Sequence, residues 1–175
     1  TAVGVNANSS VTTGNYNIAI GRNANNVCTT AGGNVAIGYT ALANNTASYN
    51  TAVGHGVLVA NTSGTFNTAL GTYVLDANTT GQQNTGLGYG TLSANTTGSD
   101  NTAAGHEALD ANTTGTSNTA IGRKALSTNT TASSNTAVGH SSLELNTTGT
   151  DNAAVGHQAL EANTTADNNT AVGAK

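Results

Sequence analysis

The residues of this chain that could do chemistry recur at a fixed interval. Seven asparagines begin Asn-x-Thr/Ser sequons spaced 17 residues apart: Asn61, Asn78, Asn95, Asn112, Asn129, Asn146 and Asn163. In a secreted protein such sequons are candidate N-glycosylation sites. The alternative is a turn in which the asparagine side chains form a ladder along a rod. Glycans on successive coils would lie only ~4.8 Å apart, and this crowding favours the ladder.

The threonines that follow these asparagines form a second periodic set. Pairs such as Thr79–Thr80 and Thr96–Thr97 recur with the same spacing. Repetitive threonine on a flat solenoid face resembles the surface of ice-binding proteins. These pairs adjoin a glycine-containing corner, however, and a corner does not offer a flat array.

The histidines are candidate metal ligands. All four, namely His55, His106, His140 and His157, occupy position 6 of the repeat defined below, and the last two lie in adjacent repeats. Two neighbouring imidazoles could share a metal ion. The same position also carries Tyr, Arg, Thr and Val, which indicates an exposed corner. We therefore expect no metal site and no cofactor.

No residues form a recognisable catalytic set. Acidic side chains recur at position 10 as Asp76, Asp110, Glu144 and Glu161, where we expect a solvated stripe that discourages lateral aggregation. The sequence contains no phosphate-binding loop and no nucleophile, base and acid that belong together. We expect no catalytic residues and no enzyme activity.

All of these residues are positioned by one repeat. The motif Asn-Thr-Ala-Val-Gly begins at Asn17, Asn34, Asn50, Asn67, Asn84, Asn101, Asn118, Asn135, Asn152 and Asn169. The spacing is 17 residues, except for one of 16 after Asn34. The consensus is N-T-A-V-G-x-x-A-L-x-A-N-T-T-G-x-x, and its first asparagine is position 1. Thr1 enters at position 2 of an earlier copy.

The glycine at position 5 marks a structural corner. It is present in every copy, and the regular repeats supply Gly54, Gly71, Gly88, Gly105, Gly122, Gly139 and Gly156. Such constancy indicates a positive φ or a close approach of backbones. Two alternating segments, positions 1–5 and 8–12, lie between turn signals and are predicted to be strands.

The repeat predicts an all-β fold, a parallel β-solenoid (β-roll) of about ten 17-residue coils. Stacked at ~4.8 Å, ten coils make a rod of roughly 50 Å. We expect Val of position 4 and Leu of position 9 to form its core. Ala of position 3 would then face a second interface, most simply other copies of the chain. Residues 1–175 form a single repeat domain, in which the N-terminal repeats of residues 1–33 are divergent and the repeats of residues 34–175 are regular.

Composition excludes several other functions. Aromatic residues make up 3% and charged residues 7% of the chain, and the formal net charge is -4. Four basic residues are too few to neutralise a phosphate backbone, so nucleic-acid binding is not expected. No segment approaches the ~20 apolar residues of a membrane span, so membrane insertion is not expected. Cys28 is the only cysteine and can form no internal disulfide.

The repeat resembles that of a known family. The segments Asn118–Thr131 (N-T-A-I-G-R-K-A-L-S-T-N-T-T) and Asn101–Gly115 (N-T-A-A-G-H-E-A-L-D-A-N-T-T-G) are similar to repeats of phage tail-fibre-like proteins. The motif N-T-A-V-G also resembles the N-S-V-A-I-G strand of trimeric autotransporter adhesin heads. The tail-fibre-like resemblance covers nearly the whole chain. It implies a parallel β-roll, a homotrimer and an extracellular location on a cell-surface appendage or virion fibre.

Two functions remain from the sequence. The favoured one is a structural subunit of an extracellular fibre, whose partner is the chain itself in a homotrimer or an end-to-end filament, with a cell-surface glycan as a further candidate partner. The chain ends on a consensus strand at Lys175, so we expect ends that join neighbouring subunits or were cut from a longer fibre. The alternative is a surface-binding solenoid that recognises polysaccharide or ice. Identical outward residues would favour the alternative, whereas the varied positions 6, 7, 16 and 17 favour the fibre.

Overall fold

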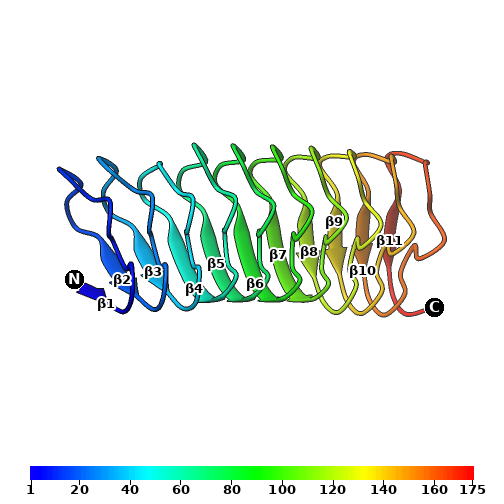
Figure 1. Ribbon diagram of the computed structural model, residues 1–175. Helices are drawn as coiled ribbons and strands as arrows, with labels where there is room; N and C mark the ends of the chain where they lie inside the picture. Colours follow the sequence, from blue (N-terminus) through cyan, green and yellow to red (C-terminus); the bar gives the residue numbers. More distant parts are fainter.

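The protein is a β-solenoid built around one parallel sheet. The computed structural model describes residues 1–175, in which eleven strands stack in sequence order with the termini at opposite ends of the rod (Figure 1). The strands are β1 (Ala2–Val3), β2 (Ile18–Ile20), β3 (Val35–Ile37), β4 (Thr51–His55), β5 (Thr68–Thr72), β6 (Thr85–Tyr89), β7 (Thr102–His106), β8 (Thr119–Ile121), β9 (Thr136–Val138), β10 (Ala153–Val155) and β11 (Thr170–Val172). The predicted all-β solenoid with one coil per 17 residues is confirmed.

Equivalent residues of successive coils lie side by side. Ala52 pairs with Ala69, and Val53 pairs with Leu70, in the ladder between β4 and β5. The 16-residue coil keeps this register, since Ala36 pairs with Ala52 in the ladder between β3 and β4. The missing residue therefore falls in the loop and leaves the sheet undisturbed.

The predicted inner and outer faces of the sheet are reversed. Alanines of position 3, such as Ala52, Ala69 and Ala103, are fully buried, whereas Leu70 of position 4 is 50% exposed. The expectation that position 4 fills the core and position 3 meets a partner is wrong. The interior is too narrow for a larger residue. At Gly86, the one glycine of position 3, an added methyl group would overlap the side chain of Val74.

The predicted second strand at positions 8–12 is also wrong. This segment is a series of turns in which leucines of position 9 adopt a left-handed conformation, with φ of 52° at Leu75 and 55° at Leu92. Its amides still bond neighbouring coils, as in Leu58 N–H to Val74 O at 3.1 Å. Inter-coil hydrogen bonding therefore continues without a β conformation. β-Branched residues are disfavoured at positive φ, and position 9 holds only Leu or Asn in the complete coils.

The core is a thin column inside the coils. It consists of alanines from positions 3 and 8 and leucines from position 9, and Leu75, Leu92 and Leu109 are among its largest fully buried side chains. Two columns of asparagine, from positions 1 and 12, complete the interior. Small side chains on the sheet let the leucines reach across and fill the space.

The assignment of faces predicts unequal responses to valine at adjacent residues. Ala120→Val should lower the free energy of unfolding by about 1–3 kcal/mol, because the added methyl groups overpack a closed interior. Thr119→Val places the same residue on the opposite face with almost no change in side-chain volume, and it should change the free energy of unfolding little. Urea unfolding followed by circular dichroism measures both. A lower stability for Thr119→Val than for Ala120→Val would contradict the assignment.

Candidate interaction face

The exposed side of the sheet carries two unbroken columns of side chains. We call positions 2 and 4 together the outer sheet face. Position 4 supplies Val3, Ile20, Ile37, Val53, Leu70, Leu87, Ala104, Ile121, Val138, Val155 and Val172, and position 2 supplies Thr1, Ile18, Val35, Thr51, Thr68, Thr85, Thr102, Thr119, Thr136, Ala153 and Thr170. Leu87 and Ile121 are 40% and 43% exposed in the middle of the rod. The result is a continuous aliphatic ridge in contact with water.

The dimensions of this face suit a macromolecular partner. Eleven strands at ~4.8 Å span roughly 50 Å, and positions 2 to 6, the extent of the longest strands, span roughly 13 Å at ~3.3 Å per residue. The outer sheet face and its border at position 6 together have a flat area on the order of 650 Å². A stable protein interface covers about 800 Å² of accessible surface on each partner. Contiguous apolar patches above a few hundred Å² usually mark an interaction site.

The threonines of position 2 keep their hydroxyl groups free. In Thr68, Thr85 and Thr102 the side chain makes no hydrogen bond within the chain. The threonines of position 13 differ, because Thr79 Oγ1 donates to Thr96 O at 3.0 Å and the pattern repeats along the rod. Free hydroxyls thus lie on the outer sheet face. The predicted threonine pairs have one member engaged in holding coils together.

A column of rings borders the outer sheet face. His55 stacks on Tyr39 with ring centroids 5.2 Å apart, His106 stacks on Tyr89 at 5.2 Å, and His140 stacks on His157 at 5.1 Å. All four histidines thus contact another ring within the chain, and His140 also contacts Arg123. No cluster of three or more metal-ligating side chains occurs. These rings stack in pairs along the rod, and Tyr73 meets His55 and Tyr89 edge to face.

The sequon asparagines form an internal ladder. All of them except the partly exposed Asn163 are fully buried. Asn78 Nδ2 donates to Asn61 Oδ1 at 2.8 Å and to Gly81 O at 3.0 Å, and the same two bonds recur coil after coil. An N-glycan would occupy this nitrogen, whose hydrogens are both engaged. The geometry therefore favours the ladder over glycosylation of the folded chain.

The asparagines of position 1 form a parallel ladder. Asn67 Oδ1 accepts from the backbone N–H of Asn84 at 3.0 Å and from Asn84 Nδ2 at 3.1 Å. Asn84 Nδ2 also donates to Gly98 O at 2.9 Å. Each side chain thus binds the previous coil and closes its own loop. The sequence identified these residues only as the start of the repeat, because a single asparagine column gives no sign of burial.

The predicted corner glycines combine a positive φ with a close approach of the backbone of the next coil. Gly54 has φ of 134°, and Gly105 has φ of 142°. A Cβ atom on Gly54 would overlap the carbonyl oxygen of Gly71 in the next coil. The other corner glycines show the same conformation and the same close approach. Their role is geometric, because only glycine allows the coils to stack here.

The acidic residues of position 10 are only partly solvated, which corrects the expected solvated stripe. One carboxylate oxygen each of Asp76 and Asp110 is buried without a hydrogen-bond partner. Burial raises the pKa of both carboxyls, partly offset by hydrogen bonds from nearby backbone amides. At Glu161, a hydrogen bond from Lys175 at 3.0 Å lowers the pKa.

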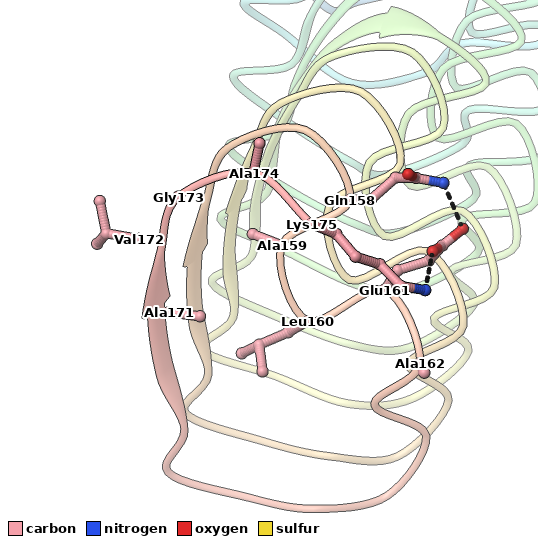
Figure 2. Close-up of a pocket in the computed structure, with 10 residues that line it drawn as sticks. All are labelled: Gln158, Ala159, Leu160, Glu161, Ala162, Ala171, Val172, Gly173, Ala174 and Lys175. Carbon is pink, nitrogen blue, oxygen red and sulfur yellow. Dashed lines mark hydrogen bonds and ion pairs between the residues drawn. The ribbon is translucent and has the colours of Figure 1, made fainter.

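One hollow lies at the end of the rod near Lys175. Figure 2 shows its apolar floor, which includes Leu160, Ala159 and Ala171, with Glu161 on the rim between Gln158 and Lys175. Glu161 accepts one hydrogen bond of 3.0 Å from each of these neighbours. The hollow lies at the open end of the coil stack, beside β11.

Comparison with protein-family models, with curated proteins and with solved structures finds no match to this chain. The resemblance to tail-fibre and adhesin repeats thus remains an expectation from the motif. The structure contains no helix long and apolar enough to cross a membrane.

The asparagine ladder predicts a high cost for a carboxylate in its place. Asn95→Asp replaces Nδ2, which donates to Asn78 Oδ1 and to Gly98 O, with one carboxylate oxygen that faces both acceptors. An uncompensated buried charge there costs about 3–5 kcal/mol. The loss should grow with pH as the new carboxyl ionises. Urea unfolding at several pH values measures it. Thr97→Ala, at an exposed residue of the same loop, is the control and should behave like the unsubstituted chain.

The buried carboxylate of Asp110 predicts a pH-dependent stability. Its folded pKa is raised, so the folded state binds the proton more tightly, and stability is lost as pH rises from the ordinary value of about 3.9 through the higher folded pKa. Asp110→Asn should flatten this dependence and raise the thermal midpoint at pH 7. The exposed Asp100→Asn should do neither. Identical pH profiles for both variants would contradict the burial argument.

Proposed function

We propose that the protein is a structural subunit of an extracellular fibre and that it associates with copies of itself through the outer sheet face. One observation carries the proposal. An aliphatic side chain is displayed at position 4 of ten coils, and Ala104 replaces it in one. Burying this ridge would remove apolar area from water at a gain of about 25 cal/mol per Å².

The rest of the molecule supports a mechanical role. In-register strands connect every coil to the next, and from Asn45 onward two asparagine ladders do so as well, so bending the rod would require many hydrogen bonds to lengthen together. The surface offers no enclosed cleft for a small substrate. Length, stiffness and repetition are the properties that this architecture supplies. They are those that a fibre shaft requires.

A second candidate function is binding to a periodic surface such as ice. It is favoured by the free threonine hydroxyls of Thr51, Thr68, Thr85, Thr102, Thr119 and Thr136, which repeat on six consecutive strands at ~4.8 Å beside a column of aliphatic groups. This regular outward array meets the criterion stated above for the alternative. The two functions compete for one face. Thermal hysteresis by a monomeric chain would support ice binding, whereas its absence would remove this candidate.

Self-association predicts that one charge on the ridge dissolves the assembly. Leu87→Glu should convert an oligomer into a monomer, because a carboxylate at the centre of an apolar interface is desolvated without a partner. Light scattering over a concentration series measures the mass. Thr97→Glu, on an exposed loop away from the sheet, should leave the oligomer intact. A monomeric unsubstituted chain at high concentration would contradict the proposal.

A further inference from the structure

The side chains of the outer sheet face vary in size from coil to coil, and the variation is matched between the two halves of the rod. We propose that two copies pack outer sheet face against outer sheet face with their rods antiparallel and a two-fold axis through Leu87. The inference rests on the proposed self-association and assigns its orientation and register. The occupant of the face is thus a second copy of this chain.

The symmetry fixes which residues would meet. A two-fold axis along the direction of β6 reverses the rod but preserves the direction of the strands. Position 2 of one copy then faces position 2 of the other, and position 4 faces position 4. β5 lies opposite β7, β4 opposite β8, β3 opposite β9 and β2 opposite β10. The two sheets therefore pack with aligned strands, one of the two usual arrangements of packed sheets.

Position 4 shows the match most clearly. Ala104, the only small residue of this column, faces Leu70, one of the largest. The remaining pairs also combine complementary or identical sizes: Ile20 with Val155, Ile37 with Val138, Val53 with Ile121, and Leu87 with its own copy. The space between the sheets is filled evenly along the rod, as a close-packed interface requires.

Position 2 gives an independent match in the same register. Ala153, the smallest residue of this column, faces Ile18, the largest. Val35 faces Thr136, which has nearly the same shape, and the remaining pairs are threonine with threonine. Two columns that differ in chemistry thus select the same axis.

Other arrangements do not satisfy both columns. If equivalent coils met in a parallel pair, the two-fold axis would run along the rod and position 2 would face position 4. Ile18 would then meet Ile20, whereas Ala104 would meet only Thr102, so the contact would be crowded at one level and open at the other. If the antiparallel register shifted by one coil, Ala104 would face Leu87, but Ala153 would face Val35 and Ile18 would face Thr170. Only the axis through Leu87 pairs Ala104 with a leucine and Ala153 with Ile18, the largest residue of its column.

The extent of the face suits a pair. The face and its border together have a flat area on the order of 650 Å². Side chains that project from this plane raise its accessible area, and a standard interface covers about 800 Å² on each partner. Both columns are free of charged side chains, so pairing buries no unpaired charge. The ring column at the border, with Tyr39, His55 and Tyr89, would form its rim.

A size exchange tests the register. Leu70→Ala and Ala104→Leu should each weaken the dimer about tenfold, through a cavity and an overlap respectively, and the double variant should recover most of the affinity. The dissociation constant from sedimentation measures the coupling. If equivalent coils meet, residues 70 and 104 are not partners, and the double variant should show the sum of two independent effects. Such additivity would overturn the proposed register.

Distance measurement tests orientation without altering the interface. Spin labels are attached to Thr97→Cys or Thr30→Cys, both on exposed loops, in a Cys28→Ser background. In the antiparallel pair, the Thr97 loops lie at one level near the axis, whereas the Thr30 loops are offset along the rod by eight coils, roughly 38 Å. Pulsed electron paramagnetic resonance should therefore give a clearly longer distance for Thr30→Cys. Mixing labelled Thr30→Cys with labelled Thr165→Cys should restore the shorter one.

The outcomes separate this inference from the proposed function. Equal distances for Thr30→Cys and Thr97→Cys would show that equivalent coils meet, which overturns the antiparallel pair and leaves self-association in place. No dipolar coupling for either label, together with a monomeric mass by light scattering, would overturn both proposals. Circular dichroism of each labelled chain confirms that the solenoid is folded.

Discussion

The two asparagine ladders are the interaction on which the solenoid depends. Each buried amide of position 1 or 12 has to be hydrogen-bonded, and its partners lie in the previous coil and in the loop of its own coil. This requirement fixes the vertical stacking and the course of the loops together. Since an unsatisfied buried amide costs about 1–3 kcal/mol, any slip of one coil against the next would be penalised at both columns. A core of alanine and leucine alone could not impose such a register.

The ladders also explain why the chain displays apolar side chains. With two asparagine columns and one leucine column inside each coil, the sheet has room for little more than a methyl group at position 3. The β-branched residues that favour a strand are therefore placed on its outside, at positions 2 and 4. The narrow interior and the aliphatic outer sheet face are thus two consequences of one packing constraint. The outer sheet face therefore stays exposed when a single chain folds, and a partner could cover it.

The sequence predicts the repeat, the solenoid and the glycine corners because each follows from spacing and from a residue type with few substitutes. It does not predict which face of the strand is inside. Alternation with period two is the same whether Ala52 or Val53 points inward, and larger side chains usually form the core.

The turn conformation at Leu75 is not predicted for a related reason, since the alternation of side chains at positions 8–12 resembles that of a strand. The one usable signal is that no complete coil has Val or Ile at position 9, as expected for a left-handed residue. The burial of Asn78 and the equivalent asparagines could not be predicted, because the sequon pattern is the same in exposed and in buried turns.

The degree of variation between coils distinguishes three environments. The inner columns at positions 1, 3, 9 and 12 are nearly uniform, because each side chain stacks on an identical neighbour and a change leaves a gap or an unbonded amide, whereas position 8 accepts Ala, Val, Ser or Thr. The loop positions 16 and 17 accept residues as different as Tyr49, Gln83 and Asp100, since they contact mainly solvent. Positions 2 and 4 fall between these limits: their sizes change, but a charged side chain never occurs in either column. Solvent alone imposes no such restriction, and the coil interior does not reach these side chains. A second surface packed against positions 2 and 4 accounts for both observations. It excludes charged side chains, and it tolerates a change of size wherever the opposite residue compensates.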